Sequence, residues 1–88
     1  MIHEIKIQSK YYKKVVTGEK TFEIRFNDRN YAVGDILKLR EIKDNMYTGE
    51  TIDVRIMYML KHADFPEGIP DGYVVFSIEK LGGLNNAR

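Results

Sequence analysis

The sequence predicts an α+β domain, mostly β: a small, mostly antiparallel β-barrel with one short N-terminal helix. Two observations support this fold class. Several segments alternate apolar and polar side chains, as half-buried strands do, whereas helical spacing occurs only near the N-terminus. No regular succession of strands and helices follows, which would indicate a parallel sheet. We expect one domain over residues 1–80 and a flexible tail over 81–88, because 88 residues leave no room for a second core.

The first two elements are a strand and a short helix. His3–Gln8 alternates and is predicted as a strand. Ser9 is the type of residue that caps a helix N-terminus, and the stretch from Tyr12 to Val16 places its apolar side chains on one stripe. Gly18 stands where a left-handed glycine ends a helix. So short a helix depends on packing for its stability.

The remaining elements are strands joined by turns. Thr21–Phe26 alternates, with three apolar side chains on one face and three polar ones on the other. A polar loop leads to a strand over Ile36–Ile42, and Asp44–Gly49 closes a hairpin onto Glu50–Leu60. The second half of that strand is apolar on both faces, which is typical of a central strand in a curled sheet. A loop with both prolines precedes the last strand, Tyr73–Lys80.

The composition excludes several classes of protein. Because the chain has no cysteine, it cannot be a disulfide scaffold, a thiolate zinc protein or a cysteine enzyme. His3 and His62 have no second ligand at metal spacing, so we expect no metal and no cofactor. No P-loop, dinucleotide motif or nucleophile elbow is present. Without a membrane span or a signal-peptide pattern, we expect a cytoplasmic protein, and a monomer is favoured.

The net charge of +1 is unevenly distributed. Residues 1–20 carry five lysines against two glutamates, whereas residues 45–80 carry six acidic side chains against three basic ones. Proteins that coat nucleic acid have a large overall positive charge, so any nucleic-acid contact here would be a local patch. Lys10, Lys13 and Lys14 would supply non-specific attraction to it. The alternative is that these lysines form an ordinary solvated helix face.

The densest cluster of polar side chains is G-E-K-T-F-E-I-R, residues 18–25. Glu23 and Arg25 lie two apart on a strand and share a face, and Lys20 precedes them at the helix–strand junction. Arginine supplies a planar fork of donors, and glutamate can accept from a base edge or orient the arginine. The same three groups would also support hydrolysis. The alternative is a surface ion pair on the solvent face of the strand.

Neighbouring residues complete the list of candidate ligand contacts. Thr21 shares the face of Glu23 and Arg25. Asn27 and Arg29 follow in a polar loop, where side chains that cap turns are the competing interpretation. Tyr47 lies in the predicted hairpin turn, where it would serve turn formation or, if exposed beside a basic cleft, stack on a base.

The motif G-x-K-x-x-E-x-R after a short helix resembles the signature of ASCH domains, a branch of the PUA-like superfamily of RNA-associated β-barrels. The match is closer to a family of small bacterial and phage proteins, DUF3850. It also covers the segments His3–Ile7, Phe22–Arg29, Val33–Leu37, Tyr47–Gly49 and Gly72–Val75. The resemblance implies a PUA-like barrel with a cleft at Lys20, Glu23 and Arg25. It also implies recognition of RNA or of a modified nucleoside.

A second branch of that superfamily contains small amidohydrolases that deacetylate N4-acetylcytidine. Their proposed machinery is a lysine at the G-x-K position, a threonine three residues later and a downstream glutamate. Lys20 matches the lysine, whereas Glu23 occupies the threonine position. Glu67 and Glu79 are both candidates for the downstream glutamate.

The leading functional prediction is a binding module for RNA or a nucleotide-like ligand. Lys20 and Arg25 would contact phosphate or a base acceptor, and Glu23 would orient Arg25 or accept from an exocyclic amine. One alternative is an amidohydrolase that acts on N4-acylated cytidine-type nucleosides, with Lys20 and Glu23 as catalytic residues. The other is a protein-interaction module of phage or mobile-element origin.

Overall fold

A computed structural model describes residues 1–81 and contains one five-stranded sheet. Its strands are β1 (Ile2–Gln8), β2 (Phe22–Phe26), β3 (Ile36–Lys43), β4 (Met46–Lys61) and β5 (Tyr73–Lys80). The helix α1 (Ser9–Thr17) follows β1, and a single 3-10 turn, η1 (His62–Asp64), follows β4. Most of the predicted tail, residues 82–88, lies outside the described residues. The described part of the chain is therefore mostly β with one α-helix.

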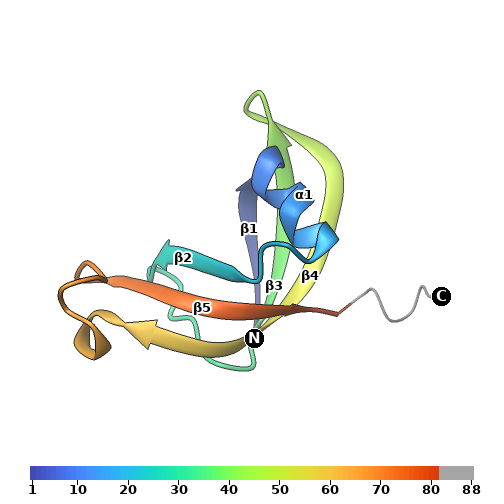
Figure 1. The fold of residues 1–88 in the computed structure, drawn as a ribbon. Helices are drawn as coiled ribbons and strands as arrows, with labels where there is room; N and C mark the ends of the chain where they lie inside the picture. Colours follow the sequence, from blue (N-terminus) through green and yellow to red (C-terminus); the bar gives the residue numbers. More distant parts are fainter. Residues whose placement is uncertain (82–88) are drawn as a thin grey trace.

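The sheet is curled into two arms that meet at a steep angle (Figure 1). Its strand order is β1-β3-β4-β5-β2, so the long β4 is the central strand. This position was predicted from its second half, which is apolar on both faces. The first half of β4 pairs with β3 and the second half with β5, with a register shift between Ile56 and Tyr58. The end strands β1 and β2 are not paired with each other. The sheet is a half-barrel that is open along a seam between β1 and β2.

One of the strand pairs is parallel. β1 runs parallel to β3, with Ile2 opposite Ile36, whereas the other three pairs are antiparallel. A parallel pair needs a long crossover connection, and here α1 and β2 lie within it. The prediction of a mostly antiparallel sheet is confirmed, but no pattern in the sequence indicated this parallel pair.

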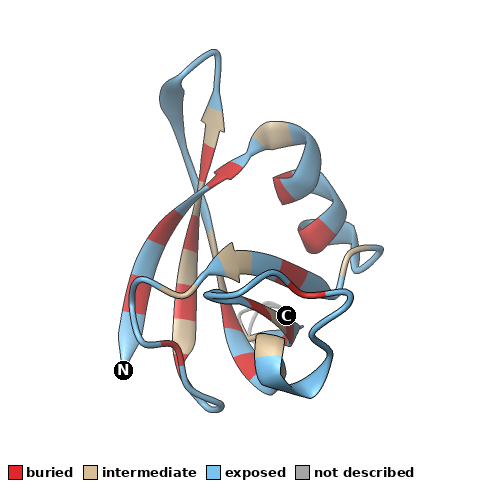
Figure 2. Ribbon diagram, turned by 90° about the vertical axis from the view of Figure 1, so that its left-hand side faces the viewer, coloured by how far each residue is buried: buried red, intermediate tan, exposed pale blue. Residues whose placement is uncertain are grey.

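The core lies on the concave side of the curled sheet. Figure 2 shows buried residues alternating with exposed ones along the strands, and the inner side of α1 turned toward the sheet. The most deeply buried strand side chains, each no more than 2% exposed, are Leu37, Leu39, Val54, Ile56, Val74 and Phe76. Tyr12 and Val15 anchor α1, while Val16, predicted in the same stripe, is 41% exposed. The apolar contact of the helix with the core thus depends on these two buried side chains.

The ends of α1 differ in how well the sequence predicts them. Gly18 adopts a left-handed conformation (φ 85°) and donates its N–H to the Val15 carbonyl, as a C-terminal glycine does. The N-cap prediction for Ser9 is wrong, since Ser9 is the first helical residue and Gln8 is the cap. The Ser9 hydroxyl donates instead to the Glu41 carboxylate at 2.6 Å.

The hairpin between β3 and β4 is tighter than predicted. Asp44 and Asn45 both have positive φ (52° and 63°), which is the conformation of a two-residue type I′ turn. Asp and Asn tolerate this region because their short polar side chains bond locally. As a result β4 begins at Met46, and Tyr47 lies in a strand rather than in a turn.

In an amphipathic strand the apolar face is expected to be buried, but in β2 the apolar face is exposed. Phe22, Ile24 and Phe26 are each at least 50% exposed, whereas Glu23 between them is 7% exposed. The Phe26 ring packs edge-on against Tyr73, with centroids 5.4 Å apart. The Glu23 side chain therefore points inward, so the interpretation that places it on the solvent face is wrong, although Glu23 does pair with Lys20 and Arg25.

A buried histidine and an aspartate join β1 to the turn before β3. His3 is 5% exposed, and its Nε2 lies 2.8 Å from Oδ2 of Asp35. The His3 ring also packs edge-on against Tyr31, with centroids 4.9 Å apart. The hydrogen bond from His3 is the main reason that the pKa of Asp35 lies below its usual value. The Asp35 carboxylate is therefore part of what holds the folded chain together.

We expect Asp35→Asn to remove part of the acid sensitivity of folding. A carboxyl whose pKa is lower in the folded chain adds stability above its unfolded pKa, near 4, and loses it as pH falls through the folded value. The difference in Tm between wild type and Asp35→Asn should therefore be largest between about pH 5 and 7 and shrink below about pH 4. Asp44→Asn, in the exposed hairpin turn, is the control. A difference that stays constant down to pH 3 would contradict this role of Asp35.

Candidate functional site

Two adjoining cavities lie along the seam between β1 and β2, with volumes of about 370 and 550 Å³. Lys6 and Arg25 line both cavities. We call the two cavities together the seam groove. The smaller cavity is the arginine end, which includes Arg29 and Arg40. The larger cavity is the helix end, which includes Lys20. The groove therefore runs along the line where the half-barrel fails to close.

Arg25 crosses the seam between the two ends of the groove. Its Nη2 donates to the backbone carbonyl of Lys6 at 2.9 Å, which links β2 to β1 where no backbone ladder joins them. The Arg25 side chain is 26% exposed, so the guanidinium remains accessible from the groove. One side chain thus connects both strands and both cavities.

The free edge of β2 presents backbone groups to the seam. On the opposite edge, the residues that flank β2 bond to the chain around β5. The Ile78 N–H donates to the Thr21 carbonyl, and the Asn27 N–H donates to the Gly72 carbonyl. In an antiparallel pair such bonds fall on every second residue, so the backbone groups of Phe22, Ile24 and Phe26 face away from β5. Lys20 Nζ donates to the Phe22 carbonyl at 2.8 Å. The wall of the groove therefore combines side chains with strand-edge donors and acceptors.

The structure brings Lys20, Glu23 and Arg25 together at the helix end. Glu23 Oε2 lies 3.1 Å from Lys20 Nζ and 3.6 Å from Arg25 Nη2. The side chains of Lys20 and Glu23 are only 13% and 8% exposed. The local cause is the turn after Gly18, which delivers Lys20 to the start of β2 and places Glu23 on its inner face.

The Glu23 carboxylate has unused acceptor capacity. Although two cations lie within 4 Å of Oε2, no donor among residues 1–81 meets it with hydrogen-bond geometry. A buried carboxylate oxygen is costly unless it is hydrogen-bonded. Oε2 is shielded from solvent between Lys20 and Arg25, and Glu23 lies in the lining of the helix end.

At the arginine end, Tyr47 is paired with an arginine. The Arg40 guanidinium carbon lies 3.8 Å from the Tyr47 ring centroid, and Lys6 Nζ lies 5.9 Å from it. Tyr47 remains 46% exposed. Arg29, predicted as a ligand contact, also lines this cavity.

Two other predicted contacts lie outside the groove. Thr21 is exposed, lines neither cavity and uses its carbonyl in the ladder with β5. The Asn27 side chain accepts from the Tyr31 backbone N–H at 2.9 Å, so it caps the loop, as the competing interpretation of this residue predicts.

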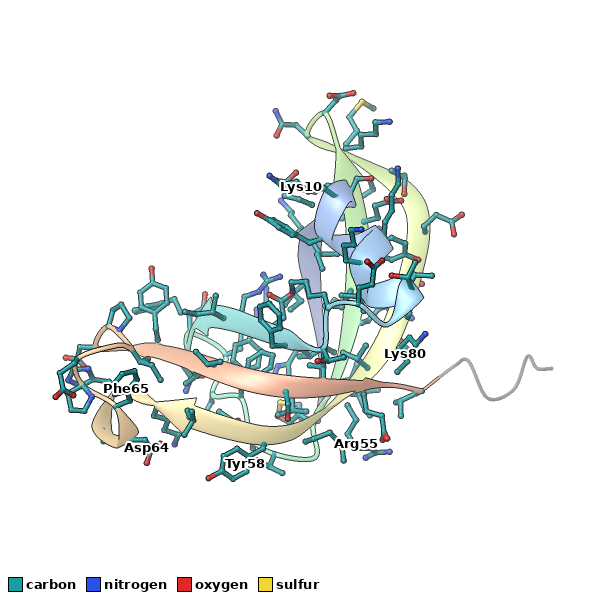
Figure 3. The ribbon with its side chains drawn as sticks, viewed as in Figure 1. Lys10, Arg55, Tyr58, Asp64, Phe65 and Lys80 are labelled. Carbon is teal, nitrogen blue, oxygen red and sulfur yellow. The ribbon has the colours of Figure 1, made fainter. Side chains whose placement is uncertain are left out.

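The three helix lysines are exposed and line neither cavity. Lys14 pairs with Glu19 at 3.3 Å. Lys10 lies over the Tyr11 ring, with Nζ 5.0 Å from its centroid, on the arm that holds β1 (Figure 3). These lysines contribute charge near the groove rather than contacts within it.

Lys6 and Arg40, which line the groove, and the buried Glu41 were not predicted from the sequence. Glu41 shares the inner face of β3 with apolar residues, is 6% exposed and accepts from Ser9 and Thr48. These two hydrogen bonds, that from Ser9 first, lower the pKa of Glu41. A carboxylate at a core-facing strand position was the available signal for Glu41. Lys6 and Arg40 carry no local signal, because they meet only through the pairing of β1 with β3.

Residues 1–81 contain no cluster of three potential ligands among His, Asp and Glu that could hold a metal ion. Over the same residues, no helix has the length and apolar character needed to cross a bilayer.

Comparison with known proteins identifies relatives of this chain. An uncharacterised 12.9 kDa protein from the GpA 3′ region of Escherichia phage P2 is 39% identical over 66 residues. That alignment covers 75% of this chain but only 61% of the phage protein. The crystal structure of hypothetical protein PH0355 has a similar fold, with a TM-score of 0.63 at 17% identity, over 92% of this chain and 100% of that one. A domain of unknown function, DUF3850, matches residues 2–78, and the chain belongs to that family.

Proposed function

We propose that the chain is a PUA-like module of the ASCH type that binds RNA or a nucleotide-like ligand in the seam groove. The observation that carries the proposal is the cluster at the helix end, where the buried Glu23 carboxylate lies between Lys20 and Arg25 and all three residues line the groove. A base edge offers amine donors to a carboxylate and acceptors to Lys20 and Arg25. Membership in DUF3850 and the curled sheet support the same assignment.

Aromatic side chains beside this cluster supply stacking surfaces. Tyr11 and Phe22 line the helix end and are 44% and 54% exposed. Lys20 Nζ lies 5.8 Å from the Tyr11 centroid and 5.1 Å from that of Phe22. Bases of single-stranded or looped RNA stack on such rings while polar groups read their edges. From the composition of the chain we propose that the protein is cytoplasmic and monomeric.

The second candidate is hydrolysis of an N4-acylated cytidine-type nucleoside. It is favoured by Lys20, which matches the lysine of the amidohydrolase motif and lies 3.1 Å from the buried Glu23 carboxylate. Two observations favour the binding module instead. The Lys20 ammonium is held by both Glu23 and the Phe22 carbonyl, and neither Glu67 nor Glu79 lines the helix end.

A titration of wild type and Lys20→Ala tests both candidates. RNA hairpins, single strands and nucleosides, including N4-acylated cytidines, are added at low salt while binding and product are both monitored. We expect binding without turnover, an affinity that falls steeply with salt, and a loss of about tenfold in Lys20→Ala. Lys14→Ala, which removes the same charge from the exposed face of α1, should change affinity far less.

Two results would overturn the binding proposal. Turnover of an acylated cytidine that disappears in Lys20→Ala would establish the hydrolase. Absence of both binding and turnover at low salt would leave the protein-interaction module as the remaining function.

A further inference from the structure

The arginine end of the seam groove gathers cations. Lys6, Arg25, Arg29 and Arg40 line this cavity of about 370 Å³, together with the acids Glu4 and Asp28. We propose that the arginine end is a phosphate-binding subsite. This subsite rests on the proposed function, because it takes the phosphate of the same ligand whose base would bind at the helix end.

Arg40 is oriented for such a role by its neighbour. Its guanidinium carbon lies 3.8 Å from the Tyr47 centroid, which covers one face of the group. A stacked guanidinium keeps its N–H donors at the edge of its plane, in the fork geometry that matches two phosphate oxygens. Glu4 lies 3.8 Å from Arg40 Nη1, which is too far for a hydrogen bond. Arg40 is thus held in place while its donors remain free.

The donors at this end are largely uncommitted. Within the described residues, the side chains of Arg29, Arg40 and Lys6 donate no hydrogen bond. Each guanidinium carries five N–H donors. Arg25 commits one bond to the Lys6 carbonyl and retains the rest. Three separate strands and a loop therefore direct unused donors to one cavity.

Charge and position indicate a phosphate ester. Four cations against two acids leave an excess of two positive charges, which matches a phosphate monoester or two adjacent diester phosphates. Arg25 also lines the helix end, so a phosphate at the arginine end lies next to a base bound beside Lys20 and Glu23. The chemistry is shared by a mononucleotide and by an internal phosphate of an RNA strand.

Arg40→Gln is the test variant, and Lys38→Gln is its matched control. Lys38 lies two residues earlier on the same face of β3, loses the same charge and lines neither cavity. The probes are inorganic phosphate, nucleosides, their 5′-monophosphates and short oligoribonucleotides. Calorimetry gives the affinities, and the NMR signals of arginine Nε–H groups report contact at Arg29 and Arg40.

We expect inorganic phosphate to shift the Arg29 and Arg40 signals, and monophosphates to bind at least tenfold more tightly than nucleosides. Arg40→Gln should remove that advantage and leave nucleoside affinity unchanged, whereas Lys38→Gln should keep it. If the affinity of dinucleotides exceeds that of nucleosides as much as the affinity of monophosphates does, the subsite binds a phosphodiester of an RNA strand. If only monophosphates gain, it takes a terminal phosphate.

The failure of this inference is distinguishable from that of the proposed function. Nucleosides or RNA that bind equally well to wild type and Arg40→Gln, without phosphate-induced shifts, would overturn the subsite and leave the binding module intact. Phosphate that shifts Arg40 while no nucleoside, nucleotide or RNA binds would support the subsite and refute the nucleotide-binding function.

Discussion

Arg25→Ala is expected to weaken ligand binding by about 10- to 100-fold while the protein remains folded. Arg25 lines both ends of the seam groove and lies 3.6 Å from Glu23. Loss of a hydrogen bond from a charged group costs about 1.5–3 kcal/mol, which corresponds to that range of affinity. Its bond to the Lys6 carbonyl is a single partly exposed contact, so unfolding should become easier by only about 1 kcal/mol. Calorimetric titration and chemical denaturation measure the two effects.

Arg55→Ala is the matched control for this variant. Arg55 also donates to a backbone carbonyl, that of Gly34 at 3.4 Å, but it lines neither cavity. In Figure 3 it projects on the far side of β5 from β2. Equal losses of affinity in the two variants would show that net charge, rather than the groove, governs binding. An unfolded Arg25→Ala protein would show that Arg25 is needed to hold the seam.

Phe76→Ala is expected to reduce the free energy of unfolding by about 3–5 kcal/mol. Phe76 is 1% exposed on the inner face of β5 and lies against Tyr31, with ring centroids 5.4 Å apart. Its removal leaves a cavity at the centre of a small core. A loss of this size approaches the whole stability of a marginal small domain, so the variant should be largely unfolded at 37 °C. Circular dichroism during chemical and thermal denaturation tests this.

Phe22→Ala is the companion to Phe76→Ala, because it truncates a phenylalanine of β2 that is 54% exposed. We expect it to change stability by less than about 1 kcal/mol. The opposite ranking of the two variants would mean that the outer and inner faces of this arm are exchanged.

The sequence alone could not decide which face of β2 is turned inward. Alternation along Thr21–Phe26 separates two faces but does not say which face is inward. The apolar face is the usual choice for the core, yet here Glu23 is buried and Phe22 is exposed. The reason is the position of β2 at the end of the sheet, where Glu23 pairs with Lys20 and Arg25 beside the seam.

Local signals predicted local structure well, and non-local structure poorly. The glycine that ends α1 and the apolar second half of β4 were both visible in the sequence. The parallel pairing of β1 with β3 joins distant segments, and no periodicity within either strand encodes it. The arginine end of the groove depends on that pairing, since Lys6 lies opposite Arg40. The motif at residues 18–25 was therefore recognisable, and Arg29 and Tyr47 were candidates at the arginine end, whereas Lys6 and Arg40 were not predicted.

The position of β2 at the sheet end also bears on the order in which the molecule assembles. The β3–β4 hairpin joins neighbouring segments and can form early, whereas β2 pairs only with β5, Phe22 opposite Ser77 far along the chain. Closing so long a loop is slow, and strands attached on one side are the first to open in the native state. We therefore expect the β2 wall of the groove to form late in folding and to open early. A ligand that spans the seam would stabilise this docking step, so recognition and the final stage of folding are one linked equilibrium.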